Sequence, residues 1–222
     1  MTLPRDLFDS FAFTAAETAA IAEAKAGKGD TWTHEGVEKL KKRIKALHLA
    51  AQGQKCCYCR RGLKGEFSLV IDIEHVLPKK GSAKGHGFPD LMFEILNLSV
   101  ACKRCNMNIK RTRTDFVDDV EAVGGDWLNS ERYRFVHPNL DPNDVALQLV
   151  TIAVGGRQAL FYSVQEGKGR FTFDFFKLRE LVVDSLDGQQ KEADQDEKPQ
   201  RWERIRTLVE ECLEAVLAED GS

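Results

Sequence analysis

The chain has 222 residues, of which 42% are hydrophobic and 30% are charged, and its formal net charge is −3. This length and composition predict a soluble globular protein with one ordinary hydrophobic core and room for a small second lobe, and they exclude global disorder. The first residues show no basic segment followed by an apolar run, and no window approaches roughly 18 consecutive apolar residues. We therefore expect neither a secretory signal nor a membrane span, and a cytoplasmic location.

Charge is distributed unevenly along the sequence. Between Lys39 and Arg113 there are 17 Lys and Arg residues against 5 Asp and Glu residues, a local balance of +12, so the rest of the chain carries −15. A basic segment inside an acidic protein is typical of a surface that binds a polyanion such as nucleic acid. Charge alone leaves the question open, because most charged runs are solvated helix faces.

The N-terminal part of the sequence has the pattern of two helices. Residues 14–26 are rich in Ala and Glu and predict a helix, which residues 25–30 end with Gly and Asp. Residues 34–51 predict a second helix, crowded with Lys and ended by Gly53. Its apolar residues recur at helical spacing, at Val37, Leu40, Ile44 and Leu47.

The middle of the sequence predicts a strand over residues 67–73, a glycine-rich loop over 78–89 and a second strand around 96–100. A short helix through Cys105, Asn106 and Lys110 follows.

Beyond Val120 the pattern changes. Residues 145–154 and 159–164 flank two glycines and predict a β-hairpin, and residues 170–176 predict a further strand. Residues 184–200 are polar and read as a flexible linker before an amphipathic closing helix. That helix contains Trp202, Ile205, Leu208, Val209, Cys212, Val216 and Leu217.

We therefore expect an α+β chain in three regions. The first is an N-terminal helical region at residues 1–54. The second is a core at 55–120, and the third is a C-terminal α+β region at 121–222, with a β-hairpin and a helix.

Six cysteines are present, and clustered cysteines in a reducing compartment are metal ligands more often than disulfides. Two CxxC pairs, Cys56 with Cys59 and Cys102 with Cys105, are separated by 42 residues. Each pair can present two thiolates to one metal, so together they predict a closed, structural Cys₄ zinc site. Cys57 has poorer spacing as a ligand, and Cys212 lies on the apolar stripe of the last predicted helix.

A histidine motif lies between the two CxxC pairs. Glu74 and His75 are followed by Pro78, then come Asn97 and Leu98, and the second CxxC pair is followed by Asn106 and Lys110. In this order and spacing, the segment from Cys56 to Lys110 resembles the HNH (ββα-metal) endonuclease family, and the interleaved CxxC pairs resemble its zinc-containing members. The resemblance implies a central ββα-metal motif held by the zinc site, and hydrolysis of phosphodiester bonds in nucleic acid.

The resemblance also implies a role for each motif residue. His75 would be the general base that deprotonates the attacking water. Glu74 and Asn106 would bind the catalytic divalent metal. At the position of Glu74 relatives more often have Asp or His, and at the position of Asn106 many have His. Asn97 would fix the loop that carries His75.

The chemistry of these side chains agrees with those roles. A neutral imidazole that titrates near physiological pH suits proton abstraction from water. A carboxylate and an amide oxygen are hard ligands that suit Mg²⁺ or Mn²⁺ and leave coordination positions open. Asp72 lies on the same strand face as Glu74 and is an alternative metal ligand, and Asn108 is a weaker alternative to Asn106.

We expect the partner to be nucleic acid, and double-stranded DNA in preference to other nucleic acids. The phosphate contacts would come from the cations on and after the short helix, which have no acidic neighbour between residues 101 and 114: Lys103, Arg104, Lys110, Arg111 and Arg113. His86, in the glycine-rich loop, is either a substrate contact or an ordinary surface histidine. His34, His48 and His137 show no partners in the sequence.

The flanks resemble, more loosely, the HNH subunits of bacterial anti-phage systems of the Septu and retron-linked types, which pair a nuclease with an ATPase. The resembling residues are 135–142, the predicted hairpin and residues 169–173. This resemblance implies a role in defence and an ATPase partner on the acidic C-terminal half. The alternative functions are a zinc-ribbon module that binds nucleic acid without catalysis, or an inert subunit of a larger complex.

Overall fold

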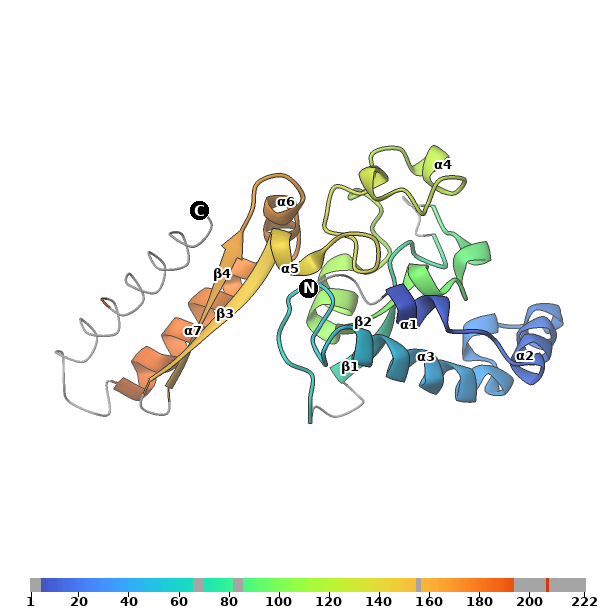
Figure 1. The fold of residues 1–222 in the computed structure, drawn as a ribbon, viewed down its shortest axis with the longest axis horizontal. Helices are drawn as coiled ribbons and strands as arrows, with labels where there is room; N and C mark the ends of the chain where they lie inside the picture. The colour runs from blue at the N-terminus through green and yellow to red at the C-terminus, as the bar shows by residue number, and fades with distance from the viewer. Residues whose placement is uncertain (1–4, 66–69, 82–85, 155–156, 194–206, 208–222) are drawn as a thin grey trace. The chain divides into compact units, whose positions relative to one another are not determined.

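The computed structural model describes residues 5–65, 70–81, 86–154, 157–193 and 207, and within these residues helices are combined with two small antiparallel sheets (Figure 1). The predicted α+β class is confirmed. The chain divides into two compact units, Met1–Gln148 with Val164–Phe176, and Leu149–Ser163 with Lys177–Ser222. Among the described residues, no helix has the length and apolar character needed to cross a membrane.

The N-terminal part of the first unit is helical, as predicted, and contains α1 (Arg5–Asp9), α2 (Ala15–Ala26) and α3 (Glu38–Ala51). Thr14 starts α2 with a capping box, in which its hydroxyl accepts from the Glu17 backbone N–H and the Glu17 carboxylate accepts from the Thr14 N–H.

Helix α3 begins four residues later than the sequence pattern predicts. Two 3₁₀ turns, η1 (Thr31–Thr33) and η2 (Glu35–Val37), come before it. His34 Nδ1 accepts from the Gly36 N–H at 3.1 Å and caps η2. This side chain-to-backbone bond competes with an α-helical start at residue 34.

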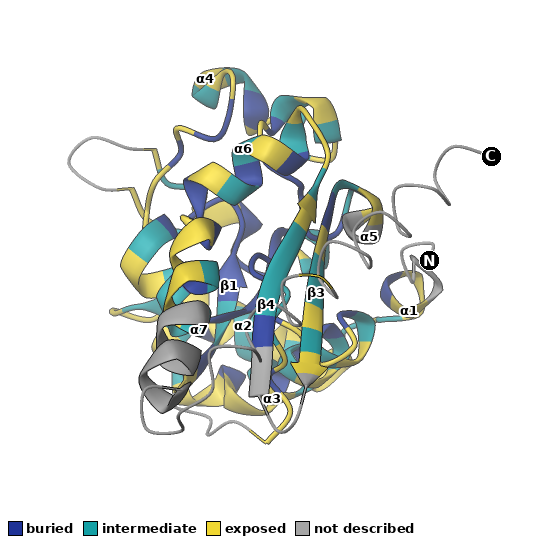
Figure 2. Cartoon of the chain, turned by 90° about the vertical axis from the view of Figure 1, so that its left-hand side faces the viewer, coloured by how far each residue is buried: buried dark blue, intermediate teal, exposed yellow. Residues whose placement is uncertain are grey.

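The apolar face of α3 belongs to a hydrophobic cluster in the core of the first unit, and Figure 2 colours the described residues by burial. His48, not Leu47, occupies the last fully buried position of this face. The core combines residues of the N-terminal helices with residues that follow the first sheet strand: Ala24, Val37, Leu40, Ile44, Met92, Phe93 and Leu98.

The central sheet consists of β1 (Ile71–His75) and β2 (Leu98–Cys102), paired antiparallel with Glu74 opposite Ser99. The chain continues from β2 into η6 (Arg104–Lys110), a π-helical turn at the predicted place of the short helix. Two strands and a helical segment therefore follow one another as expected.

The first strand ends two residues later than predicted, so that Glu74 and His75 are its last residues; residues 66–69 lie outside the described part of the chain. Between β1 and β2 the chain forms two short 3₁₀ turns, η4 (Pro89–Leu91) and η5 (Ile95–Asn97).

The remaining elements follow in chain order. They are α4 (Val120–Val123), η7 (Ser130–Arg132), α5 (Asn143–Ala146), β3 (Leu147–Val154), β4 (Arg157–Val164), α6 (Lys168–Phe175) and α7 (Leu178–Ala193). Strands β3 and β4 form the second sheet, so the predicted hairpin is confirmed.

The strand predicted over residues 170–176 is wrong, because these residues form most of helix α6. Phe171 and Phe175 stack with ring centroids 5.7 Å apart, as residues four apart on a helix do. Thr172 is buried, and its hydroxyl donates to the Lys168 carbonyl and accepts from the Val136 N–H. Alternating aromatic residues imitate a strand pattern here, whereas the Phe171–Phe175 and Thr172–Lys168 contacts join residues four apart, as in a helix.

The linker predicted from residue 184 is also wrong in its first half, because α7 continues to Ala193. The rest of that linker and the predicted closing helix with Trp202 and Cys212 lie outside the described residues, apart from residue 207.

Gln52, directly after α3, joins this helix to β2. Its side-chain oxygen accepts from the Val100 N–H at 2.9 Å and from the Ser99 hydroxyl at 3.0 Å. Its amide nitrogen donates to the carbonyl oxygens of Val100 at 2.8 Å and Lys55 at 2.7 Å. The residue is buried, so its amide satisfies polar groups that water does not reach.

Replacing Gln52→Ala should lower the free energy of unfolding by about 2 kcal/mol or more, because each buried polar group left without a partner costs about 1–3 kcal/mol. Urea unfolding followed by circular dichroism measures this change. The exposed Lys39→Ala variant is the control and should stay within about 0.5 kcal/mol of wild type. A Gln52→Ala protein as stable as this control would show that the Gln52 bonds are not needed.

Candidate functional site

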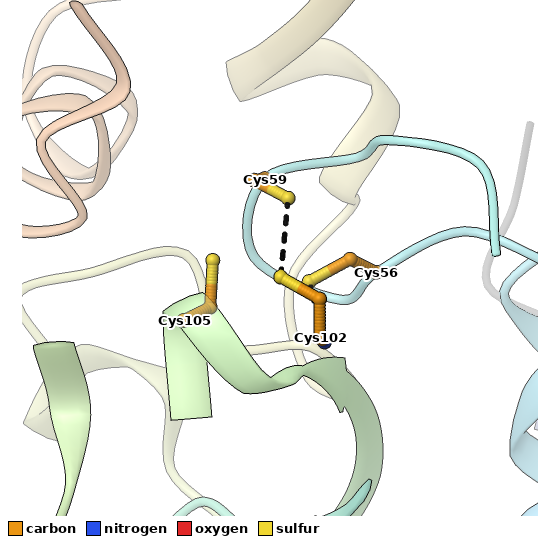
Figure 3. A group of neighbouring side chains, drawn as sticks. All are labelled: Cys56, Cys59, Cys102 and Cys105. Carbon is orange, nitrogen blue, oxygen red and sulfur yellow. Dashed lines mark hydrogen bonds between the residues drawn. The ribbon is translucent and has the colours of Figure 1, made fainter. Parts of the chain in front are cut away.

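Four cysteine side chains converge beside the central sheet (Figure 3). Cys56 and Cys59 lie in the turn after α3, Cys102 ends β2 and Cys105 is on η6. All four are buried, and their Sγ atoms lie within 4.8 Å of one another. The Cys59 and Cys102 Sγ atoms are 3.8 Å apart, and the Cys102 N–H donates to Cys56 Sγ at 3.4 Å. The two predicted CxxC pairs are thus brought together, and they could hold a metal ion such as zinc.

Negative charge is shared unequally among the four thiols. Burial raises the pKa of the Cys56 thiol, and hydrogen bonding with Cys102 raises the pKa of the Cys59 and Cys105 thiols. Hydrogen bonds from Cys105, and then from Cys56 and Cys59, hold the pKa of the Cys102 thiol far below its usual value. Burial lowers the pKa of the Arg61 guanidinium, but the negative thiolates of Cys59 and Cys102 outweigh burial and raise that pKa overall. Arg61 therefore offsets part of the negative charge that four thiolates would keep around a divalent ion.

His75 ends β1 and is buried, with an exposed fraction of 8%. Its Nε2 lies 3.1 Å from the backbone oxygen of Met92. The Trp32 ring packs edge-on against the imidazole, with ring centroids 4.4 Å apart. Burial, and then the nearby positive charge of Lys79, lower the pKa of His75 to about 3. The imidazole is therefore neutral at physiological pH and has a fixed orientation.

Asn97 holds the segment that follows His75. Its side-chain oxygen accepts from the Leu77 N–H at 2.8 Å, and its amide nitrogen donates to the carbonyls of Leu77 at 3.2 Å and Leu91 at 3.0 Å. Asn97 is fully buried. These bonds are of the kind predicted for Asn97, which connects the chain on both sides of the loop between β1 and β2.

Glu74 is buried and takes part in a polar network. Its Oε1 accepts from the Tyr58 hydroxyl at 3.0 Å and from the Lys110 ammonium at 2.7 Å. Lys110 also donates to the His75 carbonyl at 2.8 Å. Burial raises the pKa of the Glu74 carboxyl, against the opposing effect of Lys110. The network thereby joins β1 to η6 and to the first CxxC turn.

The phosphate contact predicted for Lys110 does not fit this arrangement. The residue is 1% exposed and its ammonium is already engaged by Glu74 and a backbone carbonyl. Arg104 donates to the Phe176 carbonyl at 2.9 Å, and Arg113 pairs with Asp115 and lies over the Phe175 ring. Residues 101–114 contain no acidic residue, which is why the sequence predicts phosphate contacts for all three cations. Glu74 is 36 residues before Lys110 in the sequence, and only the fold places the two side chains together.

A cavity of about 890 Å³ opens beside β1 within the first unit. Asp72, Glu74 and His75 line it from β1, and Asn106 lines it from η6, so the predicted motif residues meet there. Asp72 Oδ2 is buried and has no hydrogen-bond partner among the described residues. Asn108 is exposed and is not part of the lining, so the alternative to Asn106 does not reach this cavity.

Cationic side chains surround these polar groups. Lys103 and Arg111, two of the five predicted phosphate contacts, line the cavity. Lys79 and Lys80, which follow β1, line it as well. Their ammonium nitrogens lie 3.9 Å and 2.8 Å, respectively, from the carboxylate oxygens of Asp30. Burial, as the largest cause, lowers the pKa of the Lys79 ammonium to about 8.

Sequence reasoning missed the contribution of the N-terminal region. Trp32 lines the cavity beside His75, with the Lys79 ammonium 5.2 Å from its ring centroid. Asp30 caps the turn that carries Trp32 by accepting from its backbone N–H at 3.1 Å. The pattern of Asp30 before a short turn was readable as a cap, but nothing local indicated that the turn lies against His75.

The other histidines have structural surroundings. His48 is fully buried with its ring 5.1 Å from Phe8, and burial lowers its pKa to about 4. His137 Nδ1 accepts from the Asn139 N–H at 3.2 Å. His86 is more than half exposed and pairs with Glu121 at 3.0 Å, outside the cavity.

Comparison of the chain with protein-family models, with curated proteins and with solved structures found no match. Function is therefore inferred from the side chains and geometry of the first unit.

The cysteine cluster predicts about one tightly bound zinc ion per chain by elemental analysis. Cys59→Ser should lose the zinc and unfold, because binding of a structural metal is part of the folding free energy. Cys57→Ser is the matched control, since Cys57 is buried beside the cluster but outside it, and this variant should keep its zinc. A folded Cys59→Ser protein, or equal zinc loss in both variants, would contradict the assignment.

Proposed function

We propose that the first unit is a metal-dependent endonuclease of the HNH (ββα-metal) type that hydrolyses phosphodiester bonds in nucleic acid, with double-stranded DNA as substrate. The observation that carries the proposal is the placement of His75. A neutral, oriented imidazole lies in one cavity with the carboxylates of Asp72 and Glu74, the Asn106 amide and several cations.

The Met92 contact defines the tautomer of His75. A carbonyl oxygen only accepts hydrogen bonds, so the nitrogen that faces it, Nε2, must carry the proton. In the neutral ring Nδ1 then keeps its lone pair, and Nδ1 has no hydrogen-bond partner among the described residues. This nitrogen is the one that can take a proton from a water molecule in the cavity.

The lining residues fit a divalent cation with hard ligands. The unpartnered Asp72 Oδ2 is an orphaned buried acceptor, and an ion would satisfy it. Glu74 and Asn106 line the same cavity and would complete the oxygen set for Mg²⁺ or Mn²⁺. Such an ion would stabilise negative charge on the phosphate oxygens during hydrolysis. Because Lys110 occupies Glu74 Oε1, Asp72 is the better-placed carboxylate of the two.

The proposed reaction is a single displacement by water at phosphorus. The water gives a proton to His75 Nδ1 while its oxygen forms a bond to phosphorus. One ester P–O bond breaks, and the leaving oxygen takes a proton from solvent, which yields a phosphate monoester and an alcohol. Lys103 and Arg111 would hold the flanking phosphates, since cations neutralise the polyanion as it enters the cavity.

A nucleic-acid-binding module without catalysis is the second candidate. The Glu74–Lys110 pair favours it, because a carboxylate already paired with an ammonium has less to offer a metal ion. A role in anti-phage defence together with an ATPase remains a proposal that comes from the resemblance of the flanking segments.

Replacing His75→Ala should lower the rate of plasmid cleavage in Mg²⁺ or Mn²⁺ on the order of 10²–10⁴-fold, because the general base is lost. His86→Ala is the matched control, since His86 is an exposed histidine outside the cavity. Both variants should retain their zinc. Wild-type protein that binds DNA but does not cleave it would favour the second candidate, and cleavage by His75→Ala at the wild-type rate would remove His75 from the mechanism.

Arg111 offers a test of positioning, because its backbone is at φ 55° and ψ −127°, a conformation that non-glycine residues rarely adopt. Arg111→Gly should raise the free energy of unfolding by about 1 kcal/mol but weaken DNA binding. Gln54→Gly, at φ 59° and outside the cavity, is the control and should leave binding unchanged. Urea unfolding and equilibrium binding measure the two effects, and unchanged binding by Arg111→Gly would rule out the phosphate contact.

A further inference from the structure

Helix α3 presents three lysines to the cavity that contains His75. Lys41, Lys42 and Lys45 line this cavity together with Asp72 and His75 of β1. Lys39 lies on the same helix and is exposed, but it is not part of the lining. Helical periodicity therefore divides the lysines of α3 into a cavity-facing group and an outward-facing residue.

Backbone carbonyls hold two of the cavity-facing lysines. Lys45 donates to the Ile71 carbonyl at 2.9 Å, and Lys41 donates to the Trp32 carbonyl at 3.1 Å and pairs with Glu38. An ammonium has three N–H donors, so a single carbonyl bond orients it and leaves donors for a further acceptor. Lys42 is exposed and has no ion-pair partner within the described part of the chain, so its charge is uncompensated.

The charge of the cavity indicates the size of its ligand. Among the described residues, seven Lys and Arg side chains line the cavity against three carboxylates. Lys41 is paired with Glu38, and Lys79 and Lys80 with Asp30. The lining cations without a carboxylate partner in the described part of the chain are therefore Lys42, Lys45, Lys103 and Arg111. A cleft with this excess of positive charge concentrates polyanions. A mononucleotide carries about two negative charges, whereas a polynucleotide brings a further phosphate with each nucleotide and can meet several unpaired cations at once.

We propose that α3 is a phosphate-binding surface, formed by Lys41, Lys42 and Lys45, that holds a polynucleotide beyond the phosphate to be cleaved. The proposal rests on the proposed nuclease function and adds a contact region outside the segment from Cys56 to Lys110. The ligand is a nucleic acid strand that spans several phosphates, and a mononucleotide is a poor ligand. Contacts of this kind hold any sequence equally, because phosphates carry no base information.

The test is equilibrium binding of the full chain to a short fluorescent DNA duplex across a salt series, with Ca²⁺ in place of Mg²⁺. Lys42→Ala should reduce the log–log salt slope by about one unit, because one phosphate contact releases about 0.9 counterion. Lys39→Ala removes the same charge from the same helix and should keep the wild-type slope. Lys42→Arg should restore it.

A mononucleotide competitor should displace the duplex only at concentrations at least about 100-fold above those of an unlabelled duplex, because it makes one phosphate contact where the duplex makes several. Equal slopes for Lys42→Ala and Lys39→Ala, effective competition by the mononucleotide, or wild-type protein that does not bind DNA would each overturn the proposal. Binding is measured without turnover, so DNA binding with the predicted slopes but no cleavage in Mg²⁺ would count against the nuclease function alone.

Discussion

The arrangement of the first unit depends on bringing four buried sulfur atoms together. The two CxxC pairs lie far apart in the sequence, yet their Sγ atoms come within 4.8 Å of one another. Thiolates at this distance repel each other unless a cation lies between them. A metal ion at this position would join the turn after α3 to the end of β2 and the start of η6. Strand β1 lies between the two CxxC pairs in the sequence and pairs with β2. A metal ion that fixes both CxxC pairs would therefore also restrict the position of Glu74 and His75 at the end of β1.

The buried polar network extends the same constraint to the cavity. Tyr58 lies between two cysteines of the first turn and donates to Glu74 on β1. Its ring also stacks on Phe176, with centroids 4.1 Å apart. Lys110 reaches Glu74 from η6, so the carboxylate is bound both by the first CxxC turn, through Tyr58, and by the segment that follows the second pair, through Lys110. Burying an ion pair gives little net stability, but breaking one is costly. We infer that this network orients β1 more than it stabilises the fold.

Features that depend on local chemistry could be predicted from the sequence. The CxxC spacing identified all four cysteines of the cluster. The role of Asn97 as the amide that bonds the loop after His75 was implied by the family resemblance of the motif, and its side chain does bond the Leu77 backbone. The helix predicted over 14–26 and the two strands of the hairpin were also predictable, because Ala- and Glu-rich composition and short apolar runs are local signals.

Features that depend on contacts between distant segments could not be predicted. Lys110 reads as a free cation in the sequence, and only the fold shows that Glu74 neutralises it. Trp32 lies against His75 because α2 packs against η1, which carries Trp32, and α3, which follows, packs against β2; no local pattern encodes these contacts. The aromatic residues of α6 alternate as in a strand, whereas the buried Thr172 hydroxyl accepts from the Val136 N–H of a segment 36 residues away.

The central claim is that water, activated at His75, attacks the phosphorus of a nucleic acid backbone. Cleavage of DNA in ¹⁸O-labelled water, followed by mass spectrometry of the product ends, tests it directly. The account predicts one ¹⁸O atom in each new terminal phosphate after a single turnover, because the attacking oxygen comes from solvent. Unlabelled phosphate ends, or DNA left intact by zinc-loaded protein in Mg²⁺ and Mn²⁺, would contradict it.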